Sequence, residues 1–142
     1  MKYKDIKITL FLAEISGPRI SSDTENLNAN GAGTFIIFGN CGVLDKNIED
    51  CSIIIHNKAF RDEGTSYHYL PESESLEINK KYRKIFKEVL QENNYDYVES
   101  TTWTTDGFYR ETREKWRDFR KKELFALKWK VHLLQPFVNI KN

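Results

Sequence analysis

The stretch from Arg61 to Tyr69 holds the densest set of chemically active side chains in the sequence. Its residues are one arginine, two acids, a glycine, two hydroxyl residues, a histidine and two tyrosines. Neither face of a helix or strand with this sequence would be apolar. A polar, aromatic loop that follows an apolar strand is a usual place for ligand chemistry in α/β proteins. The stretch therefore predicts a binding or catalytic loop, with an ordinary solvated loop as the alternative.

Two shorter segments also place polar groups directly after apolar runs. The turn Gly39-Asn40-Cys41-Gly42 has backbone amides that could line an anion site at the edge of a sheet. The segment from Thr104 to Tyr109 joins hydroxyl groups to two adjacent aromatic rings, and such a ring could stack on a planar base. An alternative stays open for each segment: the first can be a simple turn, and the aromatic rings of the second can cap the sheet.

Charge and composition exclude several classes of function. Lysine and arginine together number 22 against 21 acidic residues, and the net charge of +1 gives no broad field for nucleic acid or membranes. A short basic stretch around Trp129 does not change this. No apolar run reaches the length of a transmembrane helix, and the N-terminus does not lead into a signal-peptide core. We expect a cytoplasmic protein without a membrane or nucleic-acid partner.

The histidines and cysteines indicate neither a metal site nor a redox motif. His56, His68 and His132 show no metal-ligand spacing with cysteines or carboxylates, so no metal is expected. Cys41 and Cys51 lie in or beside apolar runs and form no C-x-x-C motif. Free thiols in a reducing compartment are favoured, and a disulfide is the alternative.

Strands and helices are expected to alternate along the chain. Apolar runs predict buried strands, period-two alternation predicts one further strand, and apolar residues at helical spacing predict the helices. This order predicts a three-layer α/β/α domain with a mixed, largely parallel central sheet. The expected strands are Ile6–Ala13, Thr34–Phe38, Ser52–Ile55 and Tyr95–Thr102, and the expected helices are Arg19–Asn30, Ser75–Glu92 and Arg110–Lys122.

Four motifs, taken in order, resemble the nucleoside phosphorylase family of purine nucleoside and uridine phosphorylases. The resemblance runs from about Ile6 to Lys122, and its motifs are Ile15-Ser16-Gly17-Pro18, Phe38 to Gly42, Arg61 to Tyr69 and Thr104 to Thr112. It implies phosphorolysis, in which inorganic phosphate attacks the anomeric carbon of a nucleoside and releases a free base and ribose 1-phosphate. Phosphate is then a co-substrate, no cofactor is implied, and full-length members are homo-oligomers.

The resemblance also implies roles for particular residues, although it identifies no catalytic residue. The phosphate-binding positions are Gly39 and Asn40. The nucleoside-binding positions are Cys41 and Gly42, beside the base, with Phe108 and Tyr109 stacking on the base or sugar. The residues Arg61, Glu63 and His68 belong to a loop bordering the site, without individual roles.

Several family features are absent from the sequence. Ile37 stands where members commonly carry a phosphate-binding arginine, and Asn40 replaces a serine or threonine. An N-terminal phosphate loop and a Val-Glu-Met-Glu element that binds ribose are also missing. The resemblance therefore implies an incomplete domain at residues 1–122, truncated at both ends, with little or no activity alone. A non-catalytic remnant or a nucleoside- or phosphate-binding module is the alternative, and the choice between purine and pyrimidine stays open.

Residues 123–142 are predicted to be a tail foreign to the family. One permitted set of codons for Lys122 to Val138, read two nucleotides later, encodes the missing Val-Glu-Met-Glu. The single tryptophan codon at Trp129, followed by Lys130, forces a glutamate in that shifted frame. We hypothesise a frameshift near Lys122, and we expect the tail to be disordered or to add to the edge of a sheet.

Overall fold

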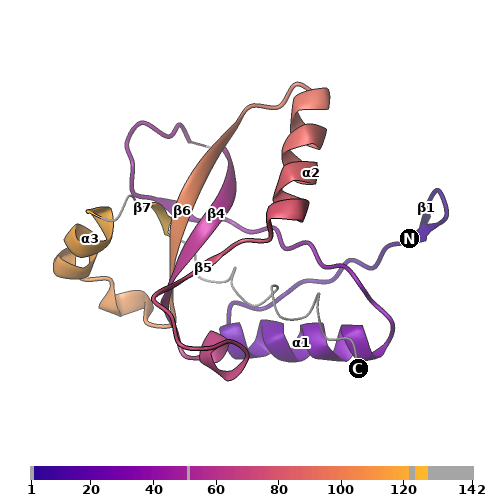
Figure 1. The fold of residues 1–142 in the computed structure, drawn as a ribbon, viewed down its shortest axis with the longest axis horizontal. Helices are drawn as coiled ribbons and strands as arrows, with labels where there is room; N and C mark the ends of the chain where they lie inside the picture. Colours follow the sequence, from indigo (N-terminus) through magenta and orange to yellow (C-terminus); the bar gives the residue numbers. More distant parts are fainter. Residues whose placement is uncertain (1, 51, 122–123, 128–142) are drawn as a thin grey trace.

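A mixed five-stranded sheet forms the centre of the part of the chain that the structure describes. The structure is a computed structural model and describes residues 2–50, 52–121 and 124–127. The strand order is β3-β7-β6-β4-β5, with β4, β6 and β7 parallel and the outer strands antiparallel to their neighbours (Figure 1). The strands are Gly42–Val43 (β3), Ile53–Asp62 (β4), Ser75–Glu77 (β5), Tyr97–Thr105 (β6) and Leu124–Leu127 (β7).

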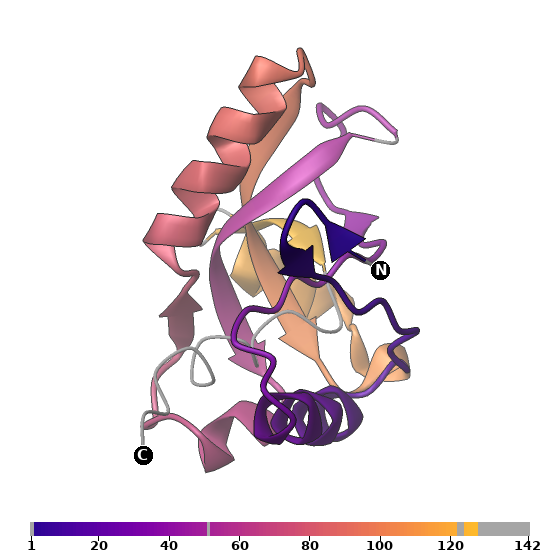
Figure 2. The same ribbon diagram turned by 90° about the vertical axis from the view of Figure 1, so that its right-hand side faces the viewer.

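Helices lie around this sheet. In Figure 1, α2 and α3 are on opposite sides of the strands, and Figures 1 and 2 both place α1 near the carboxyl ends of β4 and β6. This arrangement confirms the predicted α/β class with a mixed, largely parallel sheet. The helices are Gly17–Ala29 (α1), Thr65–His68 (η1), Lys80–Glu92 (α2), Phe108–Arg110 (η2) and Arg113–Arg120 (α3), and a hairpin of Lys2–Tyr3 (β1) and Ile6–Lys7 (β2) precedes them.

Side-chain caps explain where the α-helices begin. The Ser16 hydroxyl accepts a hydrogen bond from the backbone N–H of Arg19, and a proline follows in the first turn of α1. Asn79 and Thr112 cap α2 and α3 in the same way. After α1, Gly31 has a φ of 93°, a backbone conformation that favours glycine, which matches the predicted end of this helix.

The main apolar core lies between β4, β6 and α3. Phe60 and Trp103 are paired across the two strands and are 3% and 1% exposed. The Phe119 ring of α3 stacks on Trp103, with 4.7 Å between ring centroids. The pairing of Phe60 with Trp103 depends on a bulge in β4, where Asn57 is an extra residue between two regular stretches of the ladder.

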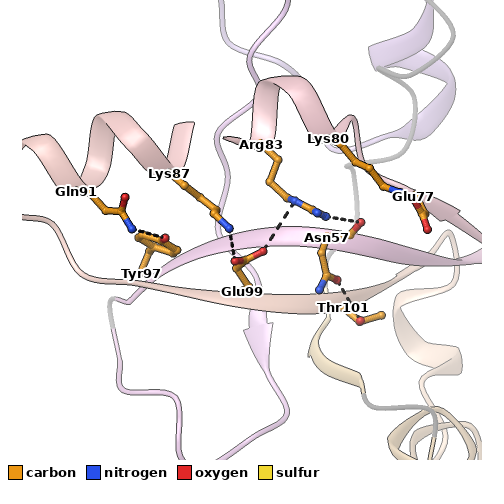
Figure 3. A network of polar contacts seen from close by, with 9 residues as sticks. All are labelled: Asn57, Glu77, Lys80, Arg83, Lys87, Gln91, Tyr97, Glu99 and Thr101. Atoms are coloured by element: carbon orange, nitrogen blue, oxygen red, sulfur yellow. Dashed lines mark hydrogen bonds and ion pairs between the residues drawn. The ribbon is translucent and has the colours of Figure 1, made fainter. Parts of the chain in front are cut away.

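Polar contacts join α2 to the amino-terminal halves of β4 and β6. Lys87 and Arg83 of α2 both form ion pairs with Glu99 of β6, at 2.6 and 3.8 Å (Figure 3). Arg83 also donates to the carbonyl of the bulged Asn57 at 3.2 Å, and the Asn57 side chain accepts from Thr101. The carbonyl of the bulged residue thus accepts from Arg83 of α2 as well as from the backbone N–H of Ile78, directly after β5.

Two predicted buried strands are wrong. Only Ile6–Lys7 of the range Ile6–Ala13 is a strand, and Thr34–Phe38 has no strand assignment. Both segments expose large apolar side chains, with Leu12 96% and Phe38 76% exposed. The apolar pattern indicated a capacity for burial, but a strand also needs a neighbouring strand to bond its backbone.

The other predicted elements are present with different boundaries. Ser52–Ile55 is the start of the longer β4, and Tyr95–Thr102 corresponds to β6. The predicted helix Ser75–Glu92 begins only at Lys80, because Asn79 caps it and Ser75–Glu77 pairs with β4. Leu124–Leu127, predicted to be tail, lies between β6 and β3 as β7 and not at an edge, while residues 128–142 lie outside the described residues.

Candidate functional site

The loop after β4 is held by the side chain of Arg61. Its Nε donates to the Ser66 hydroxyl at 2.8 Å, and its Nη1 donates to the Pro71 carbonyl at 2.7 Å and to the Ser73 hydroxyl at 3.0 Å. The guanidinium also lies over the Tyr67 ring, 3.7 Å from the centroid. Arg61 is 7% exposed, so this cation is buried beneath the loop that it contacts.

Asp106 ties three segments together at the carboxyl ends of β4 and β6. Its Oδ2 accepts from the backbone N–H of Gly64 at 2.9 Å, which joins the loop after β4 to the turn after β6. Gly17, at the start of α1, lies close to both: a Cβ there would be 2.8 Å from Thr65 Oγ1 and 3.8 Å from Asp106 Oδ1. Only glycine allows α1 to approach η1 so closely.

A cleft of about 430 Å³ opens where these segments meet. Among the residues that the structure describes, the polar lining comes from α1, the loop around η1 and Asp106, and the only basic group is the imidazole of His68. Among the described residues the lining has two carboxylates and neither lysine nor arginine, so this part of the cleft favours neutral or positively charged ligands over anions. The lining residues are Pro18, Ser21, Ser22, Glu25, Gly64, Thr65, His68, Tyr69 and Asp106.

Tyr69 and Glu25 connect the two walls of this cleft. The Tyr69 hydroxyl donates to Glu25 Oε1 at 2.7 Å. This hydrogen bond, followed by partial burial, raises the pKa of the Tyr69 phenol above its ordinary value. The phenol therefore stays protonated at neutral pH and acts as a hydrogen-bond donor.

The end of β4 is also fixed to α3. Asp62 accepts hydrogen bonds from Trp103 Nε1 at 3.1 Å and from Lys115 Nζ at 2.8 Å. Arg61 and Asp62 are consecutive, so their side chains leave the strand in opposite directions. One residue thus contacts the loop, and the next contacts the third helix.

The structure brings part of the predicted loop to the cleft. His68 lines the cleft, whereas Glu63 accepts from the Ser66 backbone at 2.9 Å and from its hydroxyl, and Arg61 lies beneath the loop. Tyr109 is fully exposed and is not among the lining residues. Phe108 lies in η2, and its side chain lies outside the described part of the structure.

The glycine turn lies apart from this cleft. Gly42 belongs to β3 and pairs with Leu127 of β7, while Gly39 and Asn40 are exposed and Cys41 is half-buried. None of these four residues lines the cleft. Leu127 in turn pairs with Trp103 of β6, so the turn sits two strands from β6, near the carboxyl end of β7.

Sequence analysis missed the contribution of α1 to the cleft. Pro18, Ser21, Ser22 and Glu25 have the spacing i, i+3, i+4 and i+7, which places them along one face of a helix. The sequence contains a signal for this face, namely a non-apolar stripe at helical spacing on a helix that begins with Ser-Gly-Pro. The few apolar residues of the same helix indicate only which side packs on the core.

The described part of the chain shows neither a metal-binding cluster nor a membrane-spanning helix. In residues 2–50, 52–121 and 124–127, no group of three His, Cys, Asp or Glu side chains is arranged to hold a metal ion. Across the same part of the chain, every helix is too short or too polar to cross a membrane.

Comparison with known proteins gives a consistent family assignment. Residues 1–126 match the family model described as the phosphorylase superfamily. A uridine phosphorylase from Thermococcus kodakarensis is 34% identical over 112 residues, which cover 76% of this chain and 39% of the relative. The chain therefore spans well under half the length of that protein.

Solved structures show the same fold. An AMP nucleosidase from Bacteroides thetaiotaomicron superposes with a TM-score of 0.74 at 24% identity, covering 86% of this chain and 54% of that one. A P. knowlesi homologue of P. falciparum PNP has a TM-score of 0.69 at 20% identity, covering 80% and 48%. A futalosine hydrolase mutant from Helicobacter pylori has a TM-score of 0.66 at 20% identity, covering 86% and 59%.

Proposed function

Because this chain belongs to the phosphorylase superfamily, we propose that it is a nucleoside phosphorylase-type protein with a nucleoside and inorganic phosphate as ligands. The family reaction transfers the ribosyl group of a nucleoside to phosphate and releases the free base. We propose further that the 142-residue chain binds a nucleoside but catalyses little or no turnover alone. The observation that carries this proposal is the bond between Asp106 and Gly64, which joins two of the motifs at one edge of the sheet.

The proposed low activity follows from a missing positive charge beside the glycine turn at Gly39 to Gly42. Phosphorolysis has an oxocarbenium-like transition state and needs cationic groups to hold phosphate beneath the sugar. Ile37 stands at the position expected for an arginine, and its side chain packs against Ile20 of α1. Loss of one such electrostatic contact can cost about 10²–10³ in rate. This supports a binding module as the second candidate function.

The charge of the cleft lining indicates which kind of ligand the cleft can bind. A nucleoside is uncharged and rich in hydroxyl groups, whereas a nucleotide adds a phosphate with about two negative charges. Glu25 and Asp106 would repel that phosphate, and no lysine or arginine among the described lining residues offsets them. We propose that the chain binds nucleosides in preference to their 5′-phosphates.

Turnover and binding should be measured separately. Chromatography of uridine, inosine and AMP after incubation, with and without phosphate, detects free base. We expect no phosphate-dependent release, and release at rates usual for enzymes would overturn the inactive reading. Base released equally without phosphate would instead indicate hydrolysis.

Titration calorimetry with the same compounds tests binding. We expect uridine or inosine to bind and Tyr69→Phe to weaken that binding, because Tyr69 lines the cleft and its hydroxyl is a hydrogen-bond donor there. Tyr95→Phe is the matched control, since Tyr95 is an exposed tyrosine just before the amino-terminal end of β6 and does not line the cleft. Absence of nucleoside binding, or equal losses in the two variants, would refute the proposed site.

A further inference from the structure

Arg61 is a buried cation without a direct carboxylate partner among the described residues. Its side chain is 7% exposed, and its hydrogen bonds go to hydroxyl and carbonyl oxygens. Nη2 is also buried and has no hydrogen-bond partner within those residues. Burial of a charge in this way costs free energy, and an apolar residue of similar length often stabilises a fold as well or better. Any benefit specific to arginine must therefore lie in geometry.

The geometry joins both ends of one loop. Nε reaches Ser66 in η1, while Nη1 reaches Pro71 and Ser73 on the segment that returns toward β5. The flat guanidinium also supports the Tyr67 ring from below. A lysine has a single nitrogen and no planar face, so it cannot make these contacts together.

Glu63 compensates the buried charge through Ser66. The Ser66 hydroxyl accepts from Arg61 and donates to Glu63, and the Ser66 backbone N–H donates to the second Glu63 oxygen at 2.9 Å. Ser66 is 1% exposed, so its bond with Arg61 is shielded from water and strengthened accordingly, while Glu63 at the other end is partly exposed. The arginine and the glutamate thus act on each other across one serine.

We propose that Arg61 and Glu63 are positioning residues that set the conformation of residues 63–73, so that His68 and Tyr69 face the cleft. Neither residue lines the cleft, whereas His68 and Tyr69 do. The two charged residues therefore shape the ligand-binding surface from beneath without touching the ligand. The ligand part of this inference rests on the proposed function, but the part concerning the loop does not.

Hydrogen exchange on the full chain tests the loop directly. In Arg61→Met, we expect backbone exchange in residues 63–73 to rise about tenfold or more, while exchange in β4 and β6 stays within about twofold. Ser66→Ala should give a similar but smaller change, and Arg61→Lys should not restore the wild-type rate. Arg83→Met is the matched control, because Arg83 is also a partly buried arginine bonded to a backbone carbonyl, but on α2.

The affinity for a nucleoside is the second readout. If Arg61 only stabilised the fold, a folded Arg61 variant would bind the nucleoside as tightly as the wild type. We expect Arg61→Met to weaken uridine or inosine binding about tenfold, with the thermal midpoint changed no more than in Arg83→Met. Unchanged exchange in residues 63–73 would overturn the inference, as would a loosened loop with unchanged affinity. If the wild type binds no nucleoside, the proposed function fails, and the exchange result alone supports or overturns the role of Arg61 in the loop. Should Arg61→Met fail to fold, Ser66→Ala decides the same question.

Discussion

Replacing Gly17 with alanine should separate α1 from η1. The new Cβ would lie 2.8 Å from Thr65 Oγ1, about 0.6 Å short of the 3.4 Å at which ordinary contact begins. Thr65 is 8% exposed and its β-branched side chain is stiff about χ1, and its Cβ, which no rotation moves, would itself lie 3.4 Å from the new atom. The helix must then move, and the cleft between α1 and η1 should widen.

The expected magnitude combines two opposing effects. Overpacking of a tight contact costs about 1–3 kcal/mol, whereas alanine in place of glycine in a helix gains up to about 1 kcal/mol. The net loss in the free energy of unfolding should be about 1–2 kcal/mol, or roughly 3–8 °C in the thermal midpoint. Urea unfolding followed by circular dichroism measures this loss.

Two further variants make the test specific. Gly33→Ala makes the same chemical change where nothing lies within 4 Å, so it should leave stability unchanged or slightly raised. Thr65→Ala should rescue Gly17→Ala, with a coupling energy of about 1 kcal/mol or more in the double-mutant cycle. The reasoning is refuted if Gly17→Ala is as stable as Gly33→Ala, or if the cycle shows no coupling.

Three other predictions concern the core, the surface and alkaline pH. Phe119→Ala should lower the free energy of unfolding by about 2–4 kcal/mol in urea titrations, because its ring stacks on Trp103. Glu99→Gln should cost at most about 1 kcal/mol, and high salt should abolish this difference, because its ion pairs with α2 are partly exposed. The raised pKa of Tyr69 gives a stabilisation that is fully present below the ordinary tyrosine pKa and is lost as pH rises through the folded value. Unfolding at pH 9 and at pH 11 should therefore differ less in Tyr69→Phe than in the wild type.

Local patterns predicted the centre of the sheet and most helices. The apolar start of β4 and the alternation in β6 are properties of single segments, and so is the apolar stripe of α2. By contrast, the segments Ile6–Ala13 and Thr34–Phe38 have strand-like patterns, yet most of their residues are not in strands. Strand formation there depends on a partner elsewhere in the chain, which periodicity does not reveal.

The candidate site was predictable to a similar extent. The unusual composition of Arg61 to Tyr69 indicated a functional loop, and His68 indeed lines the cleft. The separate roles of Arg61 and Glu63 were not predictable, because neither lines the cleft and both bond to Ser66. These roles depend on which side chains of the folded loop come within hydrogen-bonding distance. The composition of the segment does not reveal those distances.

The bulge at Asn57 decides which residues of β4 can meet which partners. A regular strand would pair Asn57 with Thr101, and Phe60 would then fall opposite Thr104, on the face away from Trp103. The extra residue reverses odd and even positions for the rest of the strand, so it directs Arg61 to the loop and Asp62 to α3. Deleting this one asparagine should leave a regular ladder with the same pairs on both sides, so that Phe60, Arg61 and Asp62 keep their partners and only the contacts of Asn57 with α2 and Thr101 are lost.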